Sequence, residues 1–568
     1  MLRGWKHFLL RAWARGTQTV GHEAGLLAAL YVLNFAPIVW FNLHSYQAQQ
    51  LGVLLLDAVF LLGGVLLYVL LLGFIPVRGV RRFLFAISFF LSLLLGVSEA
   101  FCILQYSSLI GAGIVTAVLQ TNPAEAGEFL RMYVGGKGAV AAILLLLAGL
   151  GVWRFLGRVR IPLSGHRLSR AMPAVLAVSL LAGGVLLHSY MSFIKNDSLD
   201  VPVVRVNRAV QTSVENIQAF EKLKDEAASD VQITENHSDT PYVVFILGES
   251  TNRARLHLYG YPLENTPNLD ALNAKGDLAV YQDTISPEAA TVAVLRKLLT
   301  FSDMDSDRPW YTYNNLIDVM KAAGYRTYWL SNQESSGIWG NVAQLFAGRS
   351  DYSRFTRLRE SHEDNGIYDE ALFPLVDEAL QNPAPKNFYI LHLMGGHGLY
   401  YMRFPYLFTK FTAADIPAPQ DTLSEEKRTE IEQYENAIYY NDFVVTSLMG
   451  KFADKDALVV YIPDHGEAVY DNGVFSGHVE ENPTKETLEI PMIFWASDAY
   501  KAHHPEKWRA IQAAVNRPYM TDDFIDTLLD ILDIHTAEFD PTKSVINAAF
   551  QPRTHRIVKG KDYDTEMK

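Results

Sequence analysis

Apolar and polar positions divide the chain into an apolar N-terminal part, here called the front, and a C-terminal part of mixed polarity, here called the back. Five apolar stretches in the front are long enough, or nearly so, to cross about 30 Å of hydrocarbon as helices. They lie at 25–43, 51–76, 83–104, 138–156 and 171–191. A cleavable signal peptide has one short apolar core and a small-residue cleavage site, and the first stretch matches neither feature. The pattern predicts an α-helical membrane domain of five transmembrane helices at residues 1–194.

Basic residues in the connections predict how these helices are oriented. They gather at the N-terminus, between the second and third stretches, and between the fourth and fifth: Arg3, Lys6, Arg11, Arg15; Arg78, Arg81, Arg82; Arg154, Arg158, Arg160, Arg167 and Arg170. The connection at 44–50 has no Lys or Arg, and the connection between the third and fourth stretches has only Arg131 and Lys137. Because positively charged connections stay in the cytoplasm, we expect a cytoplasmic N-terminus and a C-terminal half on the outer side.

The front and back of the chain also differ in charge. Residues 1–194 hold 14 Lys and Arg against 5 Asp and Glu, whereas the rest holds 35 against 57. This acidity excludes nucleic acid as a partner of the back half, because a phosphate backbone requires a basic face. The single cysteine, Cys102, excludes an intrachain disulfide framework and a cysteine-based structural zinc site.

Three polar residues lie in the outer half of the predicted spans: Asn34, Asp57 and Glu99. Carboxylates within a membrane are costly and usually mark a site. Facing outward together, Asp57 and Glu99 could hold a cationic group such as the ammonium of a phospholipid headgroup. The alternative is hydrogen bonding between helices. The connection after the third stretch also contains an amphipathic run, 109–130, that could lie along the outer surface.

Residues 195–240 are polar and predict a linker, with a helix near 209–227 and a polar tail. Residues 241–568 then alternate short apolar runs with helical patterns, which predicts an α/β domain with a largely parallel sheet. The clearest strands are 242–247, 325–331, 388–393, 457–462 and 491–496, and the clearest helix is 522–532.

Side chains that could bind a metal lie at or just after the ends of three of these strands. Glu249 comes after the strand at 242–247, and Asp464 and His465 come after the strand at 457–462. The strand at 388–393 includes His392 and leads to His397. Ligands bind outside the carboxyl ends of strands in open α/β sheets, so these side chains should converge. Two carboxylates and imidazoles suit a zinc ion or manganese.

A metal site of this kind needs a nucleophile, and Thr291 is a candidate at the start of the apolar helical run 292–299. A helix N-terminus offers free N–H groups and a positive dipole, which favour an alkoxide and a bound phosphate. Zinc lowers the pKa of a hydroxyl further. Thr291 could also be only a helix cap. Spacing alone does not separate it from four other hydroxyls: Thr284, Ser286, Ser250 and Thr251.

Several motifs together resemble the bacterial phosphoethanolamine transferases of the alkaline phosphatase/sulfatase superfamily. They are Gly248-Glu249-Ser250-Thr251-Asn252-Arg253, Leu258-Tyr259-Gly260-Tyr261-Pro262, Thr266-Pro267-Asn268-Leu269, Leu391-His392-Leu393-Met394-Gly395-Gly396-His397, Asp464-His465-Gly466-Glu467-Ala468-Val469-Tyr470-Asp471 and Glu481-Asn482-Pro483-Thr484. The resemblance covers essentially the whole chain. It implies a bacterial inner-membrane protein with five spans ahead of a periplasmic α/β domain of alkaline phosphatase/sulfatase type at 241–568.

The resemblance also implies the residues that carry the chemistry. Zinc would be held by Glu249, Thr291, Asp464 and His465, with Thr291 as the catalytic nucleophile. The residues implied in substrate binding are two histidines that hold the phosphoryl group or a second zinc, an asparagine near a substrate-contacting stretch, and two residues of a segment that holds the donor lipid: His397, His478, Asn332, Thr121 and Glu125.

The implied reaction moves phosphoethanolamine from phosphatidylethanolamine to an envelope acceptor, through a phosphorylated Thr291. The segment Asp540-Pro541-Thr542-Lys543-Ser544-Val545 is similar to the branch that modifies the lipopolysaccharide core. The single cysteine also favours that branch, because several lipid A-modifying members have periplasmic disulfides. The alternatives are a phosphoglycerol transferase of the lipoteichoic-acid synthase type, a membrane-tethered sulfatase or phosphodiesterase, and a non-enzymatic binding protein. The region 288–297 lacks the Cys/Ser-x-Pro-x-Arg pattern that sulfatases need.

Overall fold

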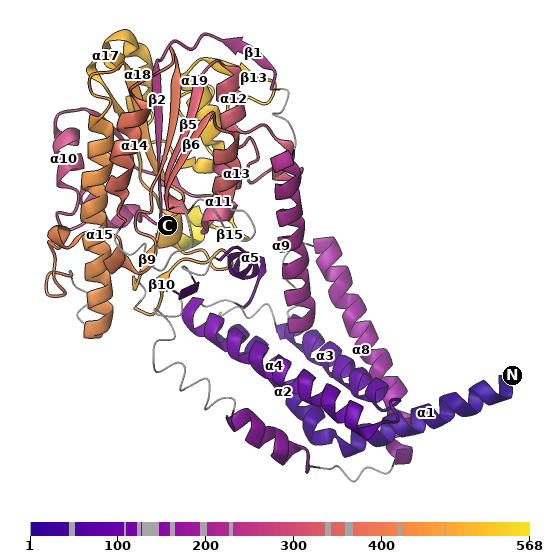
Figure 1. The fold of residues 1–568 in the computed structure, drawn as a ribbon. Helices are drawn as coiled ribbons and strands as arrows, with labels where there is room; N and C mark the ends of the chain where they lie inside the picture. Colours follow the sequence, from indigo (N-terminus) through magenta and orange to yellow (C-terminus); the bar gives the residue numbers. More distant parts are fainter. Residues whose placement is uncertain are drawn as a thin grey trace. The chain divides into compact units, whose positions relative to one another are not determined.

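The computed structural model (Figure 1) describes residues 2–44, 51–106, 109–121, 126–127, 147–159, 165–193, 201–225, 231–334, 342–357, 367–417, 423–471 and 473–568. The chain divides into two compact units, one of residues 1–115 and 129–212 and one of residues 116–128 and 213–568. The first unit is helical, and the second contains an α/β domain.

The helical unit contains apolar helices of membrane-spanning length. After α1 (Leu2–His22), the helices α2 (Ala24–His44), α3 (Leu51–Leu72) and α4 (Arg78–Tyr106) are each long and apolar enough to cross a bilayer. Shorter apolar segments follow at Leu147–Leu156 and, within α8 (Gly165–Phe193), at Arg170–Val185. Residues 138–146 of the fourth expected span lie outside the described residues. Three spans are therefore supported, and the count of five stays a prediction.

Small residues bring α3 and α8 close together. A Cβ added to Gly63 would lie 2.1 Å from the Cβ of Ser179, and one added to Gly183 would lie 2.5 Å from the ring of Phe60. The Ser179 hydroxyl donates to the carbonyl of Val59 at 2.9 Å. Such close approach through small residues is typical of helix packing in membranes, where the lipid is as apolar as the side chains.

The polar residues of the expected spans are engaged or buried within the helical unit. Glu99 Oε1 lies 2.6 Å from Arg205 Nη2 of α9 (Pro202–Asp225), and Glu99 Oε2 accepts from the backbone N–H of Ile110 at 3.1 Å. The Asn34 amide donates to the Ser92 hydroxyl at 3.0 Å, and Asp57 is fully buried. The expectation of an outward ammonium site is corrected for Glu99, because its charge is already balanced by Arg205. Interhelical bonding, the alternative interpretation, fits these contacts.

A seven-stranded sheet forms the centre of the α/β domain. Its order is β3-β11-β8-β2-β7-β5-β6. The strands are β2 (Tyr242–Gly248), β3 (Leu278–Tyr281), β5 (Arg326–Glu334), β6 (Tyr352–Arg357), β7 (Asn387–His392), β8 (Ala457–Pro463) and β11 (Met492–Ala496). All five predicted strands are present. The pairs of β2 with β7 and β8, and of β5 with β6 and β7, are parallel, whereas β11 runs antiparallel to both of its neighbours.

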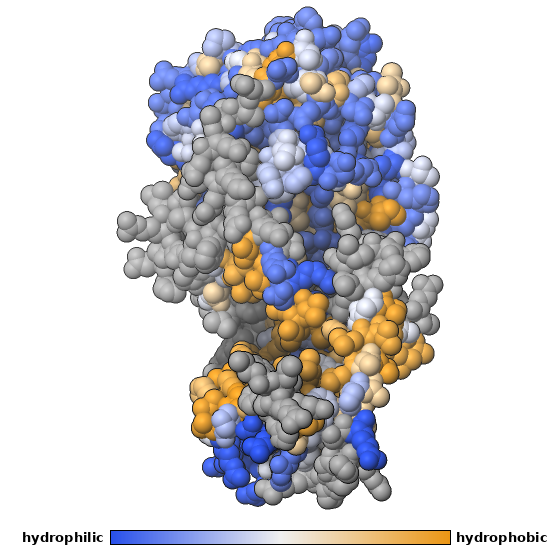
Figure 2. All heavy atoms as spheres, turned by 90° about the vertical axis from the view of Figure 1, so that its right-hand side faces the viewer, coloured by the Kyte–Doolittle hydropathy of each residue, from blue (hydrophilic) through white to orange (hydrophobic). Residues whose placement is uncertain are grey.

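Helices cover both faces of the sheet (Figure 1), as expected for strands whose residues are apolar in continuous runs. Alternate residues of β2 face two separate cores. One core is shared with α12 (Leu316–Ala322), α13 (Val342–Arg349) and α19 (Phe524–Ile531); the other is shared with α10 (Pro267–Ala274), α14 (Leu372–Ala379) and α15 (Glu425–Gly450). In Figure 2 the visible face of the α/β domain is mostly hydrophilic, whereas wide apolar areas lie over the helical unit.

The structure adds elements that the sequence pattern did not predict. The strand β1 (Ile233–Asn236), in the expected linker, pairs with β13 (Ile534–Thr536). The linker helix α9 begins at Pro202, seven residues before the predicted start. Of the amphipathic run 109–130, the helix α5 (Ala112–Gln120) is described, and residues 122–125 and 128–130 lie outside the described residues.

Candidate active site and metal centre

Three chain segments bring the predicted metal ligands to the carboxyl edge of the sheet. Glu249 follows β2, and Asp464 and His465 follow the neighbouring strand β8. Parallel pairing places Gly248 opposite Pro463, so the residues that follow leave the sheet side by side. Thr291 is the first residue of α11 (Thr291–Leu298). The two carboxylates and the imidazole are at most 1% exposed, so all three are removed from water.

The reactive atoms of these residues converge on one point. Thr291 Oγ1 lies 3.3 Å from Glu249 Oε2 and 3.4 Å from His465 Nε2. His465 Nε2 lies 3.4 Å from Asp464 Oδ2, a buried oxygen with no hydrogen-bond partner among the described residues. A buried oxygen in this position requires a partner, and a cation supplies one. Two carboxylates, an imidazole and a hydroxyl fit the four-coordinate preference of zinc.

Hydrogen bonds to neighbouring backbone and side-chain groups orient the candidate ligand atoms. His465 Nδ1 lies 2.8 Å from the carbonyl oxygen of Gly466, which can only accept, so Nδ1 carries the proton and Nε2 presents its lone pair to the site. Asp464 Oδ1 accepts from the backbone N–H of His465 at 2.7 Å. The Ser250 hydroxyl donates to Glu249 Oε1 at 2.7 Å. Such outer partners fix the direction of metal ligands, which favours a preformed site.

Electrostatics at the site also favour a cation. Burial, followed by the charge of Asp464, raises the pKa of Glu249 well above its ordinary value. Burial lowers the pKa of His465. A divalent cation between these groups keeps the carboxylates ionised and the imidazole neutral, which is the protonation state that binds metal.

The backbone around Glu249 is tightly packed. Ser250 has a left-handed conformation with φ 50°, which is costly for a residue with a side chain. Gly395, with φ 49°, lies against Glu249: a Cβ added there would be 2.5 Å from the Glu249 carbonyl oxygen. Gly395 is therefore required both for its backbone conformation and for the close approach of two strand-end loops.

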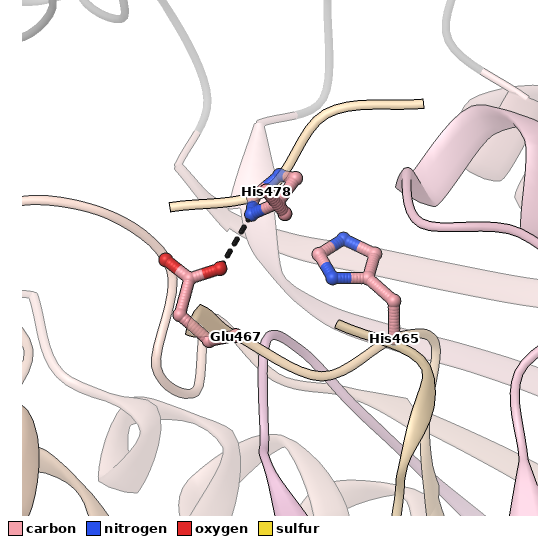
Figure 3. A group of neighbouring side chains, drawn as sticks. All are labelled: His465, Glu467 and His478. Atoms are coloured by element: carbon pink, nitrogen blue, oxygen red, sulfur yellow. Dashed lines mark hydrogen bonds and ion pairs between the residues drawn. The ribbon is translucent and has the colours of Figure 1, made fainter. Parts of the chain in front are cut away.

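A second group of possible metal ligands adjoins the first. His465, Glu467 and His478 present nitrogen and oxygen atoms that lie within 4.8 Å of one another (Figure 3). His478 Nδ1 is 2.6 Å from Glu467 Oε2, and the rings of His478 and His465 are 4.0 Å apart between centroids. Burial alone would lower the pKa of His478, but the charge and hydrogen bond of Glu467 raise it overall. The ring of His397 is 5.9 Å from that of His478.

The structure gives Asn332 an internal role. It is fully buried; its amide donates to Asp369 Oδ1 at 2.7 Å, and its oxygen accepts from the Thr356 hydroxyl. Asp369 in turn accepts from the backbone N–H groups of Met394 and Gly395, in the loop that carries His397. Asn332 thus helps to fix that loop, and its direct contact with substrate stays a prediction.

Thr121 and Glu125 are not brought to these ligands by any described contact. The Thr121 hydroxyl donates to the carbonyl of Ala117, one turn earlier, at 2.6 Å. Glu125 lies outside the described residues. The lipid-binding role expected for both residues stays a prediction.

The five candidate hydroxyls, which sequence spacing alone does not distinguish, occupy different positions in the structure. Ser250 and Thr251 donate to a side-chain and a backbone oxygen of Glu249, respectively, and Ser286 donates to the carbonyl of Glu288. Thr284 is buried on β4 (Thr284–Ile285). Among the described residues, Thr291 is the hydroxyl within 3.4 Å of both Glu249 and His465.

His392 is a structural residue, although it ends a strand at the same edge. It is buried, and its Nδ1 lies 3.2 Å from the Ser331 hydroxyl. Burial lowers its pKa to about 4, so the imidazole is neutral at physiological pH.

Sequence reasoning did not assign roles to three residues of the site. Glu467 lies within the Asp464-His465-Gly466-Glu467 motif, so its signal was present, but its pairing with His478 was not visible. Gln333 follows Asn332 directly, and its amide reaches the Leu393 carbonyl at 3.1 Å and Glu249 Oε2 at 3.5 Å. Asp369 lies in a segment with no catalytic pattern, and no signal in the sequence could have found it.

A buried carboxylate–imidazole site with a threonine at a helix N-terminus, at the edge of this sheet, defines a protein of the sulfatase class. The Sulfatase family model matches residues 241–534, which is more than half of the chain. A second model, described as phosphoethanolamine transferase EptA/EptB, matches residues 65–200. Phosphoethanolamine transferase EptC of Escherichia coli K12 is 30% identical over 478 residues, which is 80% of this chain and 80% of the relative. The chain belongs to the phosphoethanolamine transferase family.

Solved structures agree with this assignment. The C-terminal periplasmic domain of EptC from Escherichia coli, crystallised in complex with Zn, is 32% identical, with a TM-score of 0.55; the match covers 59% of this chain and 96% of that domain. Lipooligosaccharide phosphoethanolamine transferase A of Neisseria meningitidis, an integral membrane protein, shares the fold at 21% identity. The TM-score is 0.64, and the match covers 95% of this chain and 99% of that one.

Proposed function

We propose that this protein transfers phosphoethanolamine from phosphatidylethanolamine to an envelope glycolipid, with Thr291 as the nucleophile. The observation that carries the proposal is the convergence of Thr291 Oγ1 on the oxygen of Glu249 and the nitrogen of His465, at 3.3 and 3.4 Å. A hydroxyl placed beside buried metal ligands at a helix N-terminus suits attack on a phosphorus atom, because both the dipole and a cation favour its alkoxide.

The residues that would hold zinc are Glu249, Thr291, Asp464 and His465. Two observations support this choice: one oxygen of Asp464 has no hydrogen-bond partner among the described residues, and the Escherichia coli EptC domain was crystallised in complex with Zn. When bound, zinc supplies Lewis-acid charge that lowers the pKa of the threonine hydroxyl and balances negative charge on the transferring group.

The reaction would proceed by two displacements at phosphorus. Thr291 Oγ1 loses its proton as it bonds to phosphorus, the ester bond to diacylglycerol breaks, and the diacylglycerol oxygen takes up a proton. This leaves phosphoethanolamine on Thr291. The N-terminus of α11 directs backbone N–H groups at the phosphoryl oxygens and stabilises their charge. An acceptor oxygen then bonds to phosphorus, the bond between phosphorus and Thr291 Oγ1 breaks, and Thr291 Oγ1 takes up a proton.

The second displacement requires a base for the acceptor hydroxyl or phosphate. His478 or His397 would serve, and the Glu467 contact favours His478 because it fixes the ring beside His465. The acceptor oxygen gives its proton to the imidazole as it bonds to phosphorus.

The helical unit gives the site access to its lipid donor and raises the effective concentration of that donor. We propose the arrangement expected from the sequence: five spans in the bacterial inner membrane within residues 1–194, a linker at 195–240, and a periplasmic catalytic domain at 241–568, with the N-terminus in the cytoplasm. The segments Leu147–Leu156 and Arg170–Val185 would form the fourth and fifth spans.

The acceptor we propose is lipopolysaccharide, at its core in preference to lipid A. The named acceptor of the Neisseria meningitidis relative, a lipooligosaccharide, supports the class of molecule. The absence of any disulfide and the 540–545 segment support the core.

Mass spectrometry of the purified protein and of cellular lipopolysaccharide tests the proposal. After incubation with defined phosphatidylethanolamine, the wild-type protein should gain the mass of phosphoethanolamine on Thr291, and cells with the protein should carry it on lipopolysaccharide. Thr291→Ala should abolish both signals, with Thr284→Ala as the matched control. If the protein gained phosphoglycerol from a suitable lipid and not phosphoethanolamine, it would be a transferase of the lipoteichoic-acid synthase type. Hydrolysis of the lipid without transfer would identify a phosphodiesterase.

A further inference from the structure

The C-terminal end of the chain forms a hairpin that lies against the active-site loops. Its strands are β14 (Ile557–Val558) and β15 (Lys561–Asp562), which pair antiparallel. The Sulfatase match ends at residue 534, so the hairpin lies beyond it. Neither the motifs of the sequence nor the proposed mechanism gives this segment a role.

The turn of this hairpin has an unusual residue at its tip. Lys559 and Gly560 both adopt left-handed conformations, with φ 49° and 78°. Two-residue turns of this kind favour Asn or Gly at the first position, because a longer side chain is strained there. A lysine held at this position indicates that its side chain makes contacts that outweigh the strain.

The Lys559 ammonium bridges two loops that are far apart in sequence. Its Nζ lies 2.7 Å from Glu480 Oε1 and 3.4 Å from Glu288 Oε2. Glu288 lies three residues before Thr291, and Glu480 lies two residues after His478. One cation therefore joins the nucleophile loop (residues 283–290) to the His478 loop (residues 478–484), which carries the candidate base.

Contacts below the turn hold the hairpin in place. Val558 and Tyr563 are fully buried in one cluster with Ile285 and Ala289 of the nucleophile loop and Leu488. The Tyr563 hydroxyl donates to Glu489. Arg556 forms an ion pair with Asp283 at 2.8 Å, at the start of the same loop. The hairpin is thus a packed element, and its tip has a defined position relative to both loops.

We propose that Lys559 is a positioning residue: it sets the nucleophile loop and the His478 loop at the separation that phosphoryl transfer needs. This inference rests on the proposed function. Thr291 must attack phosphorus from one side, while the leaving and accepting oxygens lie on the opposite side. A shift of one loop relative to the other would therefore misalign Thr291 with these oxygens. Lys559 contacts neither reacting atom and acts through Glu288 and Glu480.

Two substitutions of Lys559 and a matched control test the inference in the full-length protein. Lys559→Met removes the charge and keeps the length, and Lys559→Arg keeps the charge. Lys451→Met is the control, because Lys451, which follows the C-terminal end of α15, forms an ion pair of similar length, 2.6 Å, with the exposed Asp377 of α14. The measurements are kcat and KM for phosphoethanolamine transfer, the rate of phosphothreonine formation, zinc content and Tm.

We expect Lys559→Met to lower kcat and the rate of phosphothreonine formation about 10- to 100-fold, with KM changed less than about 3-fold and zinc content unchanged. Lys559→Arg should restore kcat to within about 3-fold of wild type, and Lys451→Met should leave it unchanged. Glu480→Gln breaks the same bridge with Lys559 in place and should reproduce the loss, which keeps the test valid if Lys559→Met folds poorly.

Two results would overturn the inference: kcat of Lys559→Met within about 2-fold of wild type, or equal losses in Lys559→Met and Lys451→Met. The failure of the proposed function is distinguishable from both, because the wild-type protein would then form no phosphothreonine at all.

Discussion

The imidazole of His478 is held by the carboxylate of Glu467, with 2.6 Å between Nδ1 and Oε2. Glu467 is only 1% exposed and also accepts from the Tyr400 hydroxyl at 2.7 Å, so the carboxylate is itself fixed. These contacts occupy Nδ1 of His478, so Nε2 is the ring nitrogen that remains available to a substrate.

The first prediction follows from this contact. Glu467→Gln should slow transfer to the acceptor about 10- to 100-fold and let the phosphothreonine accumulate, because a neutral amide holds less firmly the imidazole that we propose as the base of the second step. Rapid-quench mass spectrometry of the enzyme with donor and acceptor measures both quantities. Tyr400→Phe, which leaves the carboxylate on His478, is the control. Equal slowing of both displacements would instead place His478 in the first step.

A second prediction concerns Gly395. Gly395→Ala should reduce activity about 100-fold, because the new methyl group lies 2.5 Å from the Glu249 carbonyl oxygen and must displace Glu249, a proposed metal ligand. The left-handed φ of 49° adds a cost of about 1 kcal/mol or more. Zinc content and transfer rate are the measurements. Gly398→Ala is the matched control, because a Cβ there meets nothing within 4 Å. Normal zinc content with normal activity in Gly395→Ala would contradict this account.

A third prediction tests the ion pair between Glu99 and Arg205. Arg205→Met should destabilise the helical unit by about 3–5 kcal/mol, because it leaves the fully buried Glu99 carboxylate uncompensated. Thermal unfolding of the full-length protein in detergent measures the effect. The double variant Glu99→Gln with Arg205→Met should recover part of the loss. If the two single losses add in the double variant, the two residues do not act as a pair.

A fourth prediction concerns pH and Asp526, a buried residue of α19. Burial raises its pKa to about 7, so the folded protein keeps a proton there that the unfolded chain releases near pH 4. The stability that this proton contributes is fully present below about pH 4 and is lost as the pH rises through about 7. Asp526→Asn keeps an oxygen for the N–H of Asp540, which donates to Asp526 Oδ1 at 2.8 Å.

The pH dependence of Tm in wild type and Asp526→Asn measures this contribution. The variant should gain stability relative to wild type as the pH rises from 5 to 8, and the gain should level off above about pH 8. A constant difference in Tm over this range would show that Asp526 does not titrate there.

The strands that surround the site could be predicted from the sequence, because their apolar runs are continuous and each ends in a polar motif. Convergence of Glu249 with Asp464 and His465 followed from parallel pairing alone. The preference for Thr291 needed the structure or a resemblance. Ser250 and Thr251 follow one strand, Thr284 and Ser286 come shortly before Thr291, and only the fold shows which hydroxyl lies beside both Glu249 and His465.

Contacts that depend on distant partners could not be predicted. Arg205 neutralises Glu99 from a position 106 residues later, and no local pattern connects them. Asn332 is a similar case, since Asp369 and Thr356 take up its side chain from two other segments. The position of Lys559 between Glu288 and Glu480 requires the fold of the whole C-terminal segment.

The register of β2 and β8 has a consequence for how such enzymes diversify. Because Gly248 lies opposite Pro463, the acidic residues that follow them, Glu249 and Asp464, leave adjacent strands at the spacing of a hydrogen-bonded pair, about 4.8 Å. Backbone pairing, which does not depend on the side chains, thus sets the distance between the two strand ends at the proposed metal site. The loops that follow these strands can lengthen, shorten or change in composition while that distance stays constant.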